Sequence, residues 1–428
     1  MGESRIVYRS DKPIRELTYI SKVNKIKILN LIRNEGTLSR SEIAKSIGLS
    51  LPTVSRLVDL LIQDDHLLVE VGTRNIERGR PPNLVTFAGD QNFVIGMSIG
   101  TVHITAVLTD LNAKIVAEKK IPTRADKGFH SIVKCSSELC MDLISSTEVD
   151  ADHVLGLGVA LTGMCDNQTN RVLYSANLGW KDRDFAGELQ AILNKPVIVD
   201  NDARVMALGE LAFGVKERFR DFICVFIGYG IGASFVVNQR LYSGKNGLTG
   251  EFGHMIVSNN STIPCSCGNY GCLDTLASGR AISIQAREAY ETSPSDILRE
   301  ICQDNPESIS AVTVSDAARA GDSDCRAILD HAADYLGIGL SAIMNLFNPE
   351  AIVLGGGLIQ GNDYLFERIG SAIKEKTLPQ IAEGVEITSS ELGERCRVMG
   401  AAALIINEIL NLNIPAYSQQ STAGDYTI

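Results

Sequence analysis

The chain has 428 residues, of which 45% are hydrophobic, 40 are Lys or Arg and 51 are Asp or Glu. This length favours two or three structural units, and the composition is that of an ordinary globular protein. No apolar run reaches the roughly 18 residues of a membrane span, and the N-terminus lacks the pattern of a secretion signal. We therefore expect a cytoplasmic protein whose ten cysteines are thiols or metal ligands, not a disulfide framework.

Charge is distributed unevenly along the chain. Residues 1–80 carry 14 basic and 10 acidic side chains, which leaves 26 basic and 41 acidic ones for the rest. A basic head on an acidic body suggests that the head alone meets a polyanion. The imbalance is modest and indicates no function by itself.

Two short helices are predicted at the start of the chain. An apolar periodicity predicts the first over Lys22–Asn34, and Gly36 ends it. Ser39 and Glu42 have the spacing of a capping box, which opens a second helix that stops at Gly48. This pair, followed by a tight turn, is the beginning of a helix-turn-helix pattern.

A third helix is predicted over Leu51–Gln63, because its apolar side chains recur at the spacing of one helical face. The outer face of its first turns carries short polar side chains and one arginine, namely Pro52, Thr53, Ser55 and Arg56. Such side chains at the start of a recognition helix are typical of a major-groove reader. We count Arg40, at the start of the preceding helix, among the candidate DNA contacts.

Two strands, predicted over residues 67–71 and 83–87, flank a loop rich in glycine and arginine. Arg74, Arg78 and Arg80 make this loop a cationic finger that suits a narrow minor groove. The head is therefore predicted to be a winged helix-turn-helix that binds DNA. A three-helix protein-interaction module with a solvated basic loop is the alternative. DNA-binding heads of this geometry usually dimerise to span two half-sites.

After Asn92 the pattern changes to short strands separated by glycine turns. The predicted elements are strands over Phe93–Ile99, His103–Thr109, Lys114–Ile121 and Val154–Leu161, and a helix over Phe129–Ser145. Residues 222–237 repeat the order of strand, glycine turn and strand, and Ala351–Leu354 runs into Gly355–Gly357. Two similar α/β halves predict two lobes that close on a ligand-binding cleft.

The most specific chemistry of the chain lies between His254 and Asp274. Cys265, Cys267 and Cys272 fall within eight residues, and His254 stands eleven residues upstream of the first of them. Three thiolates and one imidazole form a closed tetrahedral set for zinc, the usual structural type. Ordinary buried cysteines or a disulfide are the alternatives.

Together, these features resemble the ROK family of repressors and sugar kinases within the actin-like ATPase superfamily. The resemblance extends from about residue 20 to 410 and is closest to the family's bacterial sugar-responsive repressors. Its most specific motifs are Gly250–His254, the cysteine group, Asp200–Ala203 and Asn348–Gly357. It implies an α/β fold in which a winged helix-turn-helix over residues 1–88 precedes a two-lobed actin-like body. The first lobe is expected over 89–202, completed by 395–428, and the second lobe, with the zinc site, over 203–394.

The resemblance also implies a sugar pocket. In the family, the residues that match Asn201, Asp202, Glu251, His254 and Asp274 contact sugar hydroxyls. Carboxylates accept hydrogen bonds, an amide donates and accepts, and imidazole can do either, so the set suits vicinal hydroxyls. His254 would bind zinc through one ring nitrogen and face the sugar with the other. Asp274 replaces the usual glutamate and is shorter by one methylene, which implies either an indirect contact or a bulkier ligand. Solvated loop carboxylates are the alternative for Glu251 and Asp202.

Two phosphate-binding turns separate this chain from the family's kinases, in which the residue matching Asp202 is the general base. Residues 98–102 read Ser-Ile-Gly-Thr-Val where the kinases have Asp-x-Gly-Gly-Thr, so the metal carboxylate is missing. The second turn, usually Gly-Thr-Gly, is Gly228-Tyr229-Gly230. Phosphoryl transfer depends on positioning and charge neutralisation, so we expect binding without catalysis. An ATP-dependent sugar kinase with an appended DNA-binding head is the alternative.

The predicted function is transcriptional regulation, as a repressor of carbohydrate uptake or metabolism genes controlled by a bound sugar or sugar phosphate. The predicted partners are operator DNA, this effector, zinc and a second copy of the chain, in a homodimer or a dimer of dimers. A protein partner in place of the free sugar is an alternative.

Overall fold

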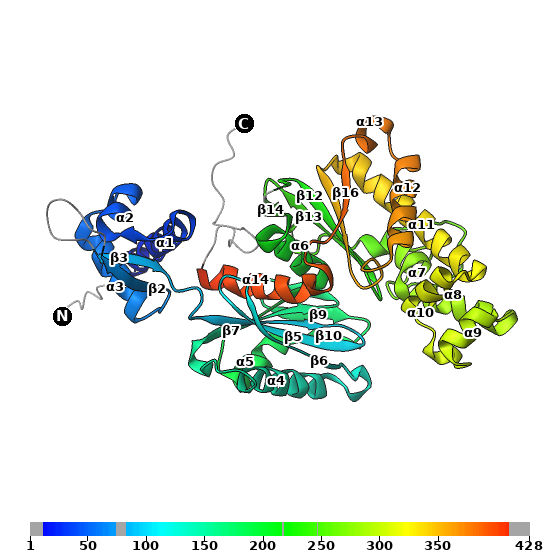
Figure 1. Cartoon of the computed structure of the whole chain (residues 1–428), viewed down its shortest axis with the longest axis horizontal. Coiled ribbons are helices and arrows are strands. Elements are labelled where there is room, and N and C mark those ends of the chain that lie inside the picture. Colours follow the sequence, from blue (N-terminus) through cyan, green and yellow to red (C-terminus); the bar gives the residue numbers. More distant parts are fainter. Residues whose placement is uncertain (1–11, 74–82, 216–217, 246, 411–428) are drawn as a thin grey trace, which may run out of the picture.

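The computed structural model describes residues 12–73, 83–215, 218–245 and 247–410. It consists of an N-terminal head at one end of an elongated molecule, a first lobe in the middle and a second lobe at the other end (Figure 1). No helix in these ranges is long and apolar enough to cross a membrane.

The head is a winged helix-turn-helix. Its elements are α1 (Lys12–Glu35), β1 (Leu38–Ser39), α2 (Arg40–Ile47), α3 (Leu51–Gln63), β2 (Leu68–Thr73) and β3 (Asn83–Phe87). The strands form an antiparallel sheet in the order β1-β3-β2. Helix α2 opens on the predicted capping box, in which the Glu42 carboxylate accepts the Ser39 N–H at 2.7 Å, and it ends at the left-handed Gly48. The predicted winged helix-turn-helix fold is confirmed.

Helix α1 begins ten residues earlier than predicted, at Lys12 and not at Lys22. Pro13 falls in its first turn, where the missing N–H costs no intrahelical hydrogen bond. The prediction rested on an apolar periodicity that is clear only in the later turns, and so it missed this start. The predicted wing contacts Arg74, Arg78 and Arg80 lie outside the described residues.

The first lobe is built on a five-stranded sheet in the order β11-β7-β4-β5-β6. The elements are β4 (Phe93–Ile99), β5 (His103–Asp110), β6 (Ile115–Pro122), α4 (Phe129–Ser145), β7 (Val154–Leu161), α5 (Phe185–Leu193) and β11 (Val197–Asn201). A small meander of β8 (Met164–Asp166), β9 (Arg171–Ser175) and β10 (Trp180–Arg183), not foreseen from the sequence, follows β7. Strands β4 and β7 are almost wholly buried, as their continuous apolar runs require.

The second lobe contains a five-stranded sheet in the order β14-β13-β12-β15-β16. Its strands are β12 (Phe222–Ile227), β13 (Ile231–Val237), β14 (Arg240–Leu241), β15 (Ala351–Gly355) and β16 (Glu386–Ser389). Its helices are α6 (Asp202–Phe213), α7 (Leu273–Ala277), α8 (Gly279–Thr292), α9 (Asp296–Cys302), α10 (Ala311–Ala320), α11 (Ser323–Phe347), α12 (Asp363–Lys376) and α13 (Pro379–Ala382).

The two large sheets share one topology. In each, a central strand pairs antiparallel with the strand that follows it, which in turn pairs antiparallel with a third. On its other side the central strand pairs parallel with a later strand, and that strand with a still later one. Strands β4 and β12 are therefore equivalent, and the predicted repeat of two α/β halves is confirmed.

Helix α14 (Cys396–Leu410) connects the parts of the molecule. It packs on β4, β7 and α6, and a Cβ added to Gly158 would lie 1.9 Å from the Ala401 carbonyl oxygen. Glycine is therefore required where the helix and the sheet backbone approach each other. The later turns of α14 place Ile405 and Leu410 in one hydrophobic cluster with Ile28 and other head residues. The head thus packs on the body through α14, while the proposed domain boundaries remain a prediction.

Candidate functional site

Four side chains converge at the predicted metal site. One ligand atom from each of His254, Cys265, Cys267 and Cys272 lies within 4.8 Å of all the others. Two isolated β-bridges, Ile256 with Cys272 and Pro264 with Tyr270, fold this segment back on itself. A Cβ at Gly271 would lie 1.8 Å from the Ser258 carbonyl oxygen, so this tight turn needs glycine.

The spacing of these donors fits zinc. The Cys267 and Cys272 sulfurs are 3.6 Å apart, and the Cys265 sulfur is 3.4 Å from Nδ1 of His254. Tetrahedral zinc with bonds of about 2.3 Å to sulfur and 2.0 Å to nitrogen separates its ligand atoms by about 3.5–3.8 Å. The sulfurs are too far apart for a disulfide, and all three cysteines are free thiols in the structure. The residues therefore fit a closed structural zinc site.

His254 lies between this cluster and the predicted sugar pocket. Its Nδ1 faces Cys265, whereas its Nε2 lies 3.9 Å from the Glu251 carboxylate. Burial raises the pKa of Glu251. The His254 imidazole lowers this pKa in part, and the charge of Asp202 raises it further. The two ring nitrogens thus face different groups, and the sharing of His254 between metal and sugar remains a prediction.

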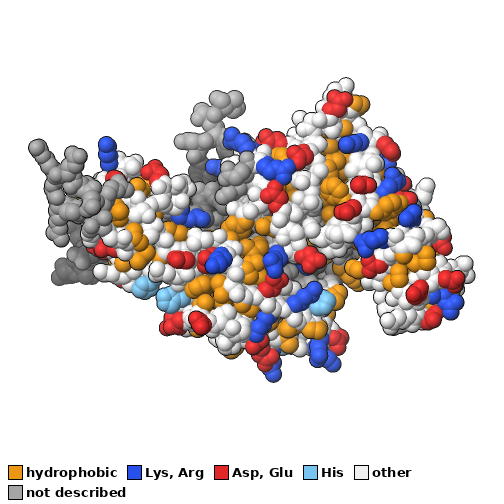
Figure 2. Space-filling view, in the orientation of Figure 1, with side chains coloured by type: hydrophobic (Ala, Val, Ile, Leu, Met, Phe, Trp, Pro, Cys, Tyr) orange, Lys and Arg blue, Asp and Glu red, His pale blue; other side chains and the backbone are white. Residues whose placement is uncertain are grey.

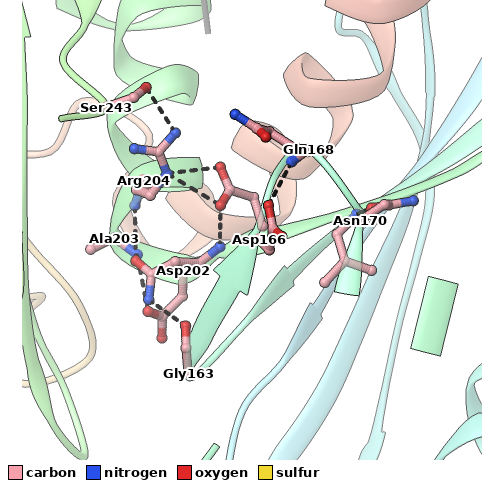
Figure 3. A network of polar contacts seen from close by, with 11 residues as sticks. Gly163, Asp166, Gln168, Asn170, Asp202, Ala203, Arg204 and Ser243 are labelled. Carbon is pink, nitrogen blue, oxygen red and sulfur yellow. Dashed lines mark hydrogen bonds and ion pairs between the residues drawn. The ribbon is translucent and has the colours of Figure 1, made fainter. Parts of the chain in front are cut away.

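Helix α6 begins at the two residues predicted to bind sugar hydroxyls. Asn201 caps the helix, with Oδ1 accepting the Ala203 N–H at 3.0 Å, and its amide donates to the Gly163 carbonyl at 2.9 Å (Figure 3). Asp202 is 7% exposed, and its carboxylate accepts a hydrogen bond of 2.9 Å from the Thr162 hydroxyl. Asn201 therefore caps the helix and Asp202 presents a fixed carboxylate, and the contacts of both with sugar hydroxyls remain predictions.

A buried ion pair fixes the start of α6. Nε of Arg204 lies 3.0 Å from the Asp200 carboxylate, and both side chains are 2% exposed. The Arg204 guanidinium also donates to the Ser243 hydroxyl at 3.2 Å (Figure 3). Breaking a buried pair by removing one partner is strongly destabilising, so this network holds Asn201 and Asp202 in place.

Asp274, in the first turn of α7, points to the second phosphate turn. Its carboxylate accepts the Ile231 N–H at 2.9 Å, next to Gly230. Burial raises the pKa of Asp274, and the backbone bond, Arg280 and His254 each lower it. The charge of Asp202 raises the pKa of Glu251 and that of His254 lowers the pKa of Asp274, so within each pair the two groups lie near each other. A direct sugar contact of Asp274 remains a prediction.

Two residues near Asp202 were not predicted from the sequence. Thr162, just after β7, donates to Asp202. Arg397, in the first turn of α14, places Nη1 3.9 Å from the Asp202 carboxylate. Burial raises the pKa of Asp202, and Arg397 and Thr162 lower it in part. No local pattern links these positions to Asp202, because they come from distant segments of the chain.

In the head, the candidate contacts differ in how firmly the protein holds them. Pro52 and Arg56, near the start of α3, are exposed, and Thr53 and Ser55 are half-buried. The Ser50 hydroxyl accepts the Thr53 N–H and so caps the helix. Arg40 instead forms ion pairs with Asp59 at 2.7 Å and with Glu70 at 2.9 Å. Its DNA contact remains a prediction, and these carboxylates compete for its guanidinium.

Comparisons with known proteins agree with this architecture. The family model "ROK family" matches residues 94–408, and the model "Winged helix-turn-helix DNA-binding" matches residues 23–65. The xylose repressor of Caldicellulosiruptor bescii is 28% identical over 401 residues, which cover 94% of this chain and 99% of that protein. A glucokinase of Halalkalibacterium halodurans is 30% identical, with 73% of this chain and 94% of the glucokinase covered.

A solved structure is also similar over nearly the whole chain. It is a ROK family transcriptional regulator described as a homologue of the Escherichia coli MLC protein. The two structures match with a TM-score of 0.75 at 26% sequence identity, covering 91% of this chain and 96% of that one. The chain therefore belongs to the ROK family, and its winged helix-turn-helix head places it with the transcriptional regulators of that family.

Proposed function

We propose that this ROK protein is a sugar-responsive repressor that binds operator DNA through its head and an effector in its body. The observation that carries the proposal is the winged helix-turn-helix joined to a sugar-kinase-like body. The xylose repressors among its relatives make xylose the first effector to test, and other sugars and sugar phosphates follow. Genes of carbohydrate uptake or metabolism are the expected targets.

DNA binding is assigned to the head. Helix α3 would enter the major groove with its N-terminal turns, where the exposed Arg56 can reach a base edge or a phosphate. Acidic and basic side chains are interspersed over the visible face of the body (Figure 2). A surface of mixed sign is a poor match for a polyanion, which supports the assignment to the head.

The effector would lie against Asp202 and Glu251, with His254 held in place by zinc. The thiol and imidazole donors would fix the ring of His254, and zinc would supply this rigidity and no chemical step. Asp202 and Glu251 would accept hydrogen bonds from sugar hydroxyls. The zinc therefore serves recognition in this proposal.

Loss of phosphoryl transfer is part of the proposal. The first turn exposes Val102 (59%) and the second exposes Tyr229 (44%), where the family's kinases carry hydroxyl donors. Val102 has no donor, Tyr229 carries its hydroxyl at the end of a bulky ring, and neither side chain supplies the charge neutralisation that the transferred phosphoryl group needs. Because glucokinases are among the relatives, a sugar kinase with a DNA-binding head is the alternative. Sugar-dependent ATP consumption by the purified protein would favour that alternative.

Helix α14 offers a path between the effector and the DNA-binding head. Its first turn lies beside Asp202, and its later turns share a hydrophobic cluster with the head. By linkage, an effector that weakens DNA binding must itself bind more weakly to the DNA-bound form. We expect a homodimer, so that two heads meet two half-sites.

Operator binding in the presence and absence of sugars tests the proposal. The intact protein should retain an operator fragment in a gel shift and release it when xylose or another effector is added. Arg56→Ala is expected to weaken operator binding about tenfold or more, whereas the control Lys134→Ala, on α4 of the body, should leave it unchanged. Failure of every sugar and sugar phosphate to alter operator affinity would overturn the effector model.

A further inference from the structure

One arginine lies between the sugar carboxylates and the phosphate turns. Arg397 stands in the first turn of α14, with Nη1 3.9 Å from the Asp202 carboxylate. Its guanidinium stacks on the Phe226 ring at 4.9 Å from the ring centroid. Stacking on an aromatic face orients the guanidinium plane, so the cation has a defined place beside Asp202.

The same guanidinium lies next to the first turn, and the ring on which it stacks lies against the second. A Cβ added to Gly100, in the first turn, would lie 3.5 Å from Nη1 of Arg397. Phe226, on which Arg397 stacks, is the neighbour of Gly228 in the second turn, where an added Cβ would meet its ring at 2.7 Å. Arg397 therefore lies close to Asp202 and to the first glycine turn, and through Phe226 it is linked to the second.

The donors of Arg397 are available to a ligand. Its guanidinium makes no hydrogen bond to the part of the chain that the structure describes, and its side chain is 28% exposed. The 3.9 Å separation from Asp202 is an ion pair too long for a hydrogen bond. A planar group with five N–H donors binds a phosphate in a bidentate manner and with charge assistance.

We propose that Arg397 forms an anion subsite for a phosphomonoester, so that the effector pocket takes a phosphorylated sugar. This inference rests on the proposed function, because Asp202 and Glu251 would hold the sugar hydroxyls while Arg397 holds the phosphate. A phosphate attached to a hydroxyl beside Asp202 would reach Arg397 directly. The chain would thereby distinguish a phosphorylated sugar from the free sugar by one fixed cation.

The environment of Asp202 is compatible with a nearby anion. Burial raises the pKa of its carboxyl group, so the group can hold a proton more readily than an exposed aspartate. The Arg397 guanidinium, 3.9 Å away, offsets the charge of the carboxylate and so reduces its repulsion of a nearby phosphate. The alternative role of Arg397 is to neutralise Asp202 alone, and this predicts no preference for phosphorylated ligands.

Calorimetric titration of the full-length protein separates these roles. The ligands are glucose, glucose 6-phosphate, xylose, xylose 5-phosphate and inorganic phosphate, at constant ionic strength. Arg397→Met keeps an extended side chain against Phe226 without the charge, and Arg397→Lys restores a charge. Arg395→Met is the matched control, because Arg395 is two residues away and pairs with Glu118 on the surface.

The phosphorylated sugar is expected to bind the intact protein more tightly than the free sugar. Arg397→Met should weaken the phosphorylated ligand about 10- to 100-fold and the free sugar less than threefold. Arg397→Lys should recover part of this loss, and Arg395→Met should change neither ligand. Inorganic phosphate should compete with the phosphorylated sugar for binding to the intact protein. In Arg397→Met it should no longer compete.

Two results would overturn the subsite. One is an equal loss of affinity for phosphorylated and free sugars in Arg397→Met. The other is the absence of binding by every phosphorylated ligand, even where a free sugar binds. Operator binding measured on the same preparations keeps the two proposals apart: if operator is not bound while Arg397-dependent phosphate binding holds, the repressor function fails and the subsite stands.

Discussion

The proposed effector site has two sides, a sugar side around Asp202 and a phosphate side at the two glycine turns, and they differ in how their residues are held. On the sugar side, Asp202 begins a helix braced by a buried ion pair, and His254 belongs to a four-donor cluster. On the phosphate side, two glycine turns expose Val102 and Tyr229 to solvent. Binding of a sugar needs only hydrogen-bond acceptors that are fixed in place. Phosphoryl transfer also needs donors to the phosphates and a carboxylate that holds the metal. One site can therefore keep the residues for binding and lack those for transfer.

This difference has a physical cause. The sugar-side residues also cap a helix and close a metal cluster, so their loss would cost stability as well as affinity. Exposed turn residues contribute little to stability, and substitutions there leave the fold intact. Residues on the phosphate side can therefore be substituted without loss of the fold, whereas substitution of the sugar-side residues would lower stability.

The largest expected effect comes from the metal cluster that supports the sugar side. Cys267→Ser should remove bound zinc and lower the free energy of unfolding by more than about 3 kcal/mol, because one ligand of a closed structural site is lost. Metal analysis and thermal denaturation measure both effects. Cys135→Ser, at a thiol on α4 outside the cluster, is the control and should retain the metal. Unchanged metal content in Cys267→Ser would refute the site.

The next largest effect is expected from the Asp202 carboxylate on the sugar side. Asp202→Asn should weaken binding of the effector sugar about 10- to 100-fold, because charge-assisted hydrogen bonds to its hydroxyls are lost. Titration of the sugar measures the loss, and operator binding without sugar should persist. Asp142→Asn, which removes an exposed carboxylate on α4, should leave sugar affinity unchanged. Equal affinity in Asp202→Asn and the intact protein would remove Asp202 from the pocket.

A smaller effect tests the buried support of α6. Glu210 is fully buried and accepts a hydrogen bond of 2.5 Å from the Ser390 hydroxyl, and burial raises the pKa of its carboxyl group. A pKa raised above the unfolded value means that stability is lost as pH rises through the folded pKa. Glu210→Gln, which can keep the Ser390 bond, should therefore be more stable than the intact protein at pH 8. The two proteins should converge at pH 4, below the ordinary glutamate pKa of 4.5.

Urea unfolding at both pH values measures this difference, and Glu288→Gln, at an exposed carboxylate on α8, should show none of it. Destabilisation of Glu210→Gln at pH 8 would mean that the fold requires the charged carboxylate.

The smallest effect is expected in the head, where Arg40 forms ion pairs within the protein and Arg56 is exposed. Arg40→Ala should cost less than about 1 kcal/mol of stability, because Asp59 and Glu70 are both more than two-fifths exposed. An unchanged slope in the salt dependence of operator binding would mean that the Arg40 guanidinium stays with Asp59 and Glu70. A slope reduced by about one would instead place Arg40 on a DNA phosphate.

Local patterns in the sequence determined much of this protein. The capping box at Ser39 and Glu42, the apolar face of α3 and the strands of both halves follow from short-range spacing, and the structure has them. The metal donors were also predictable, because three of the four lie within eight residues and the chain between them can fold in few ways. Such features need only neighbouring residues, so they can be recognised without the fold.

The tertiary structure alone decided which of the polar residues share a space and what each one bonds. It commits Asn201 to capping α6 and Asp274 to the backbone at Ile231, and it brings Arg397 to Asp202. It also packs α14 against the head. These contacts join segments far apart in the chain, and they depend on how sheets and helices pack in three dimensions. No periodicity or spacing encodes that packing.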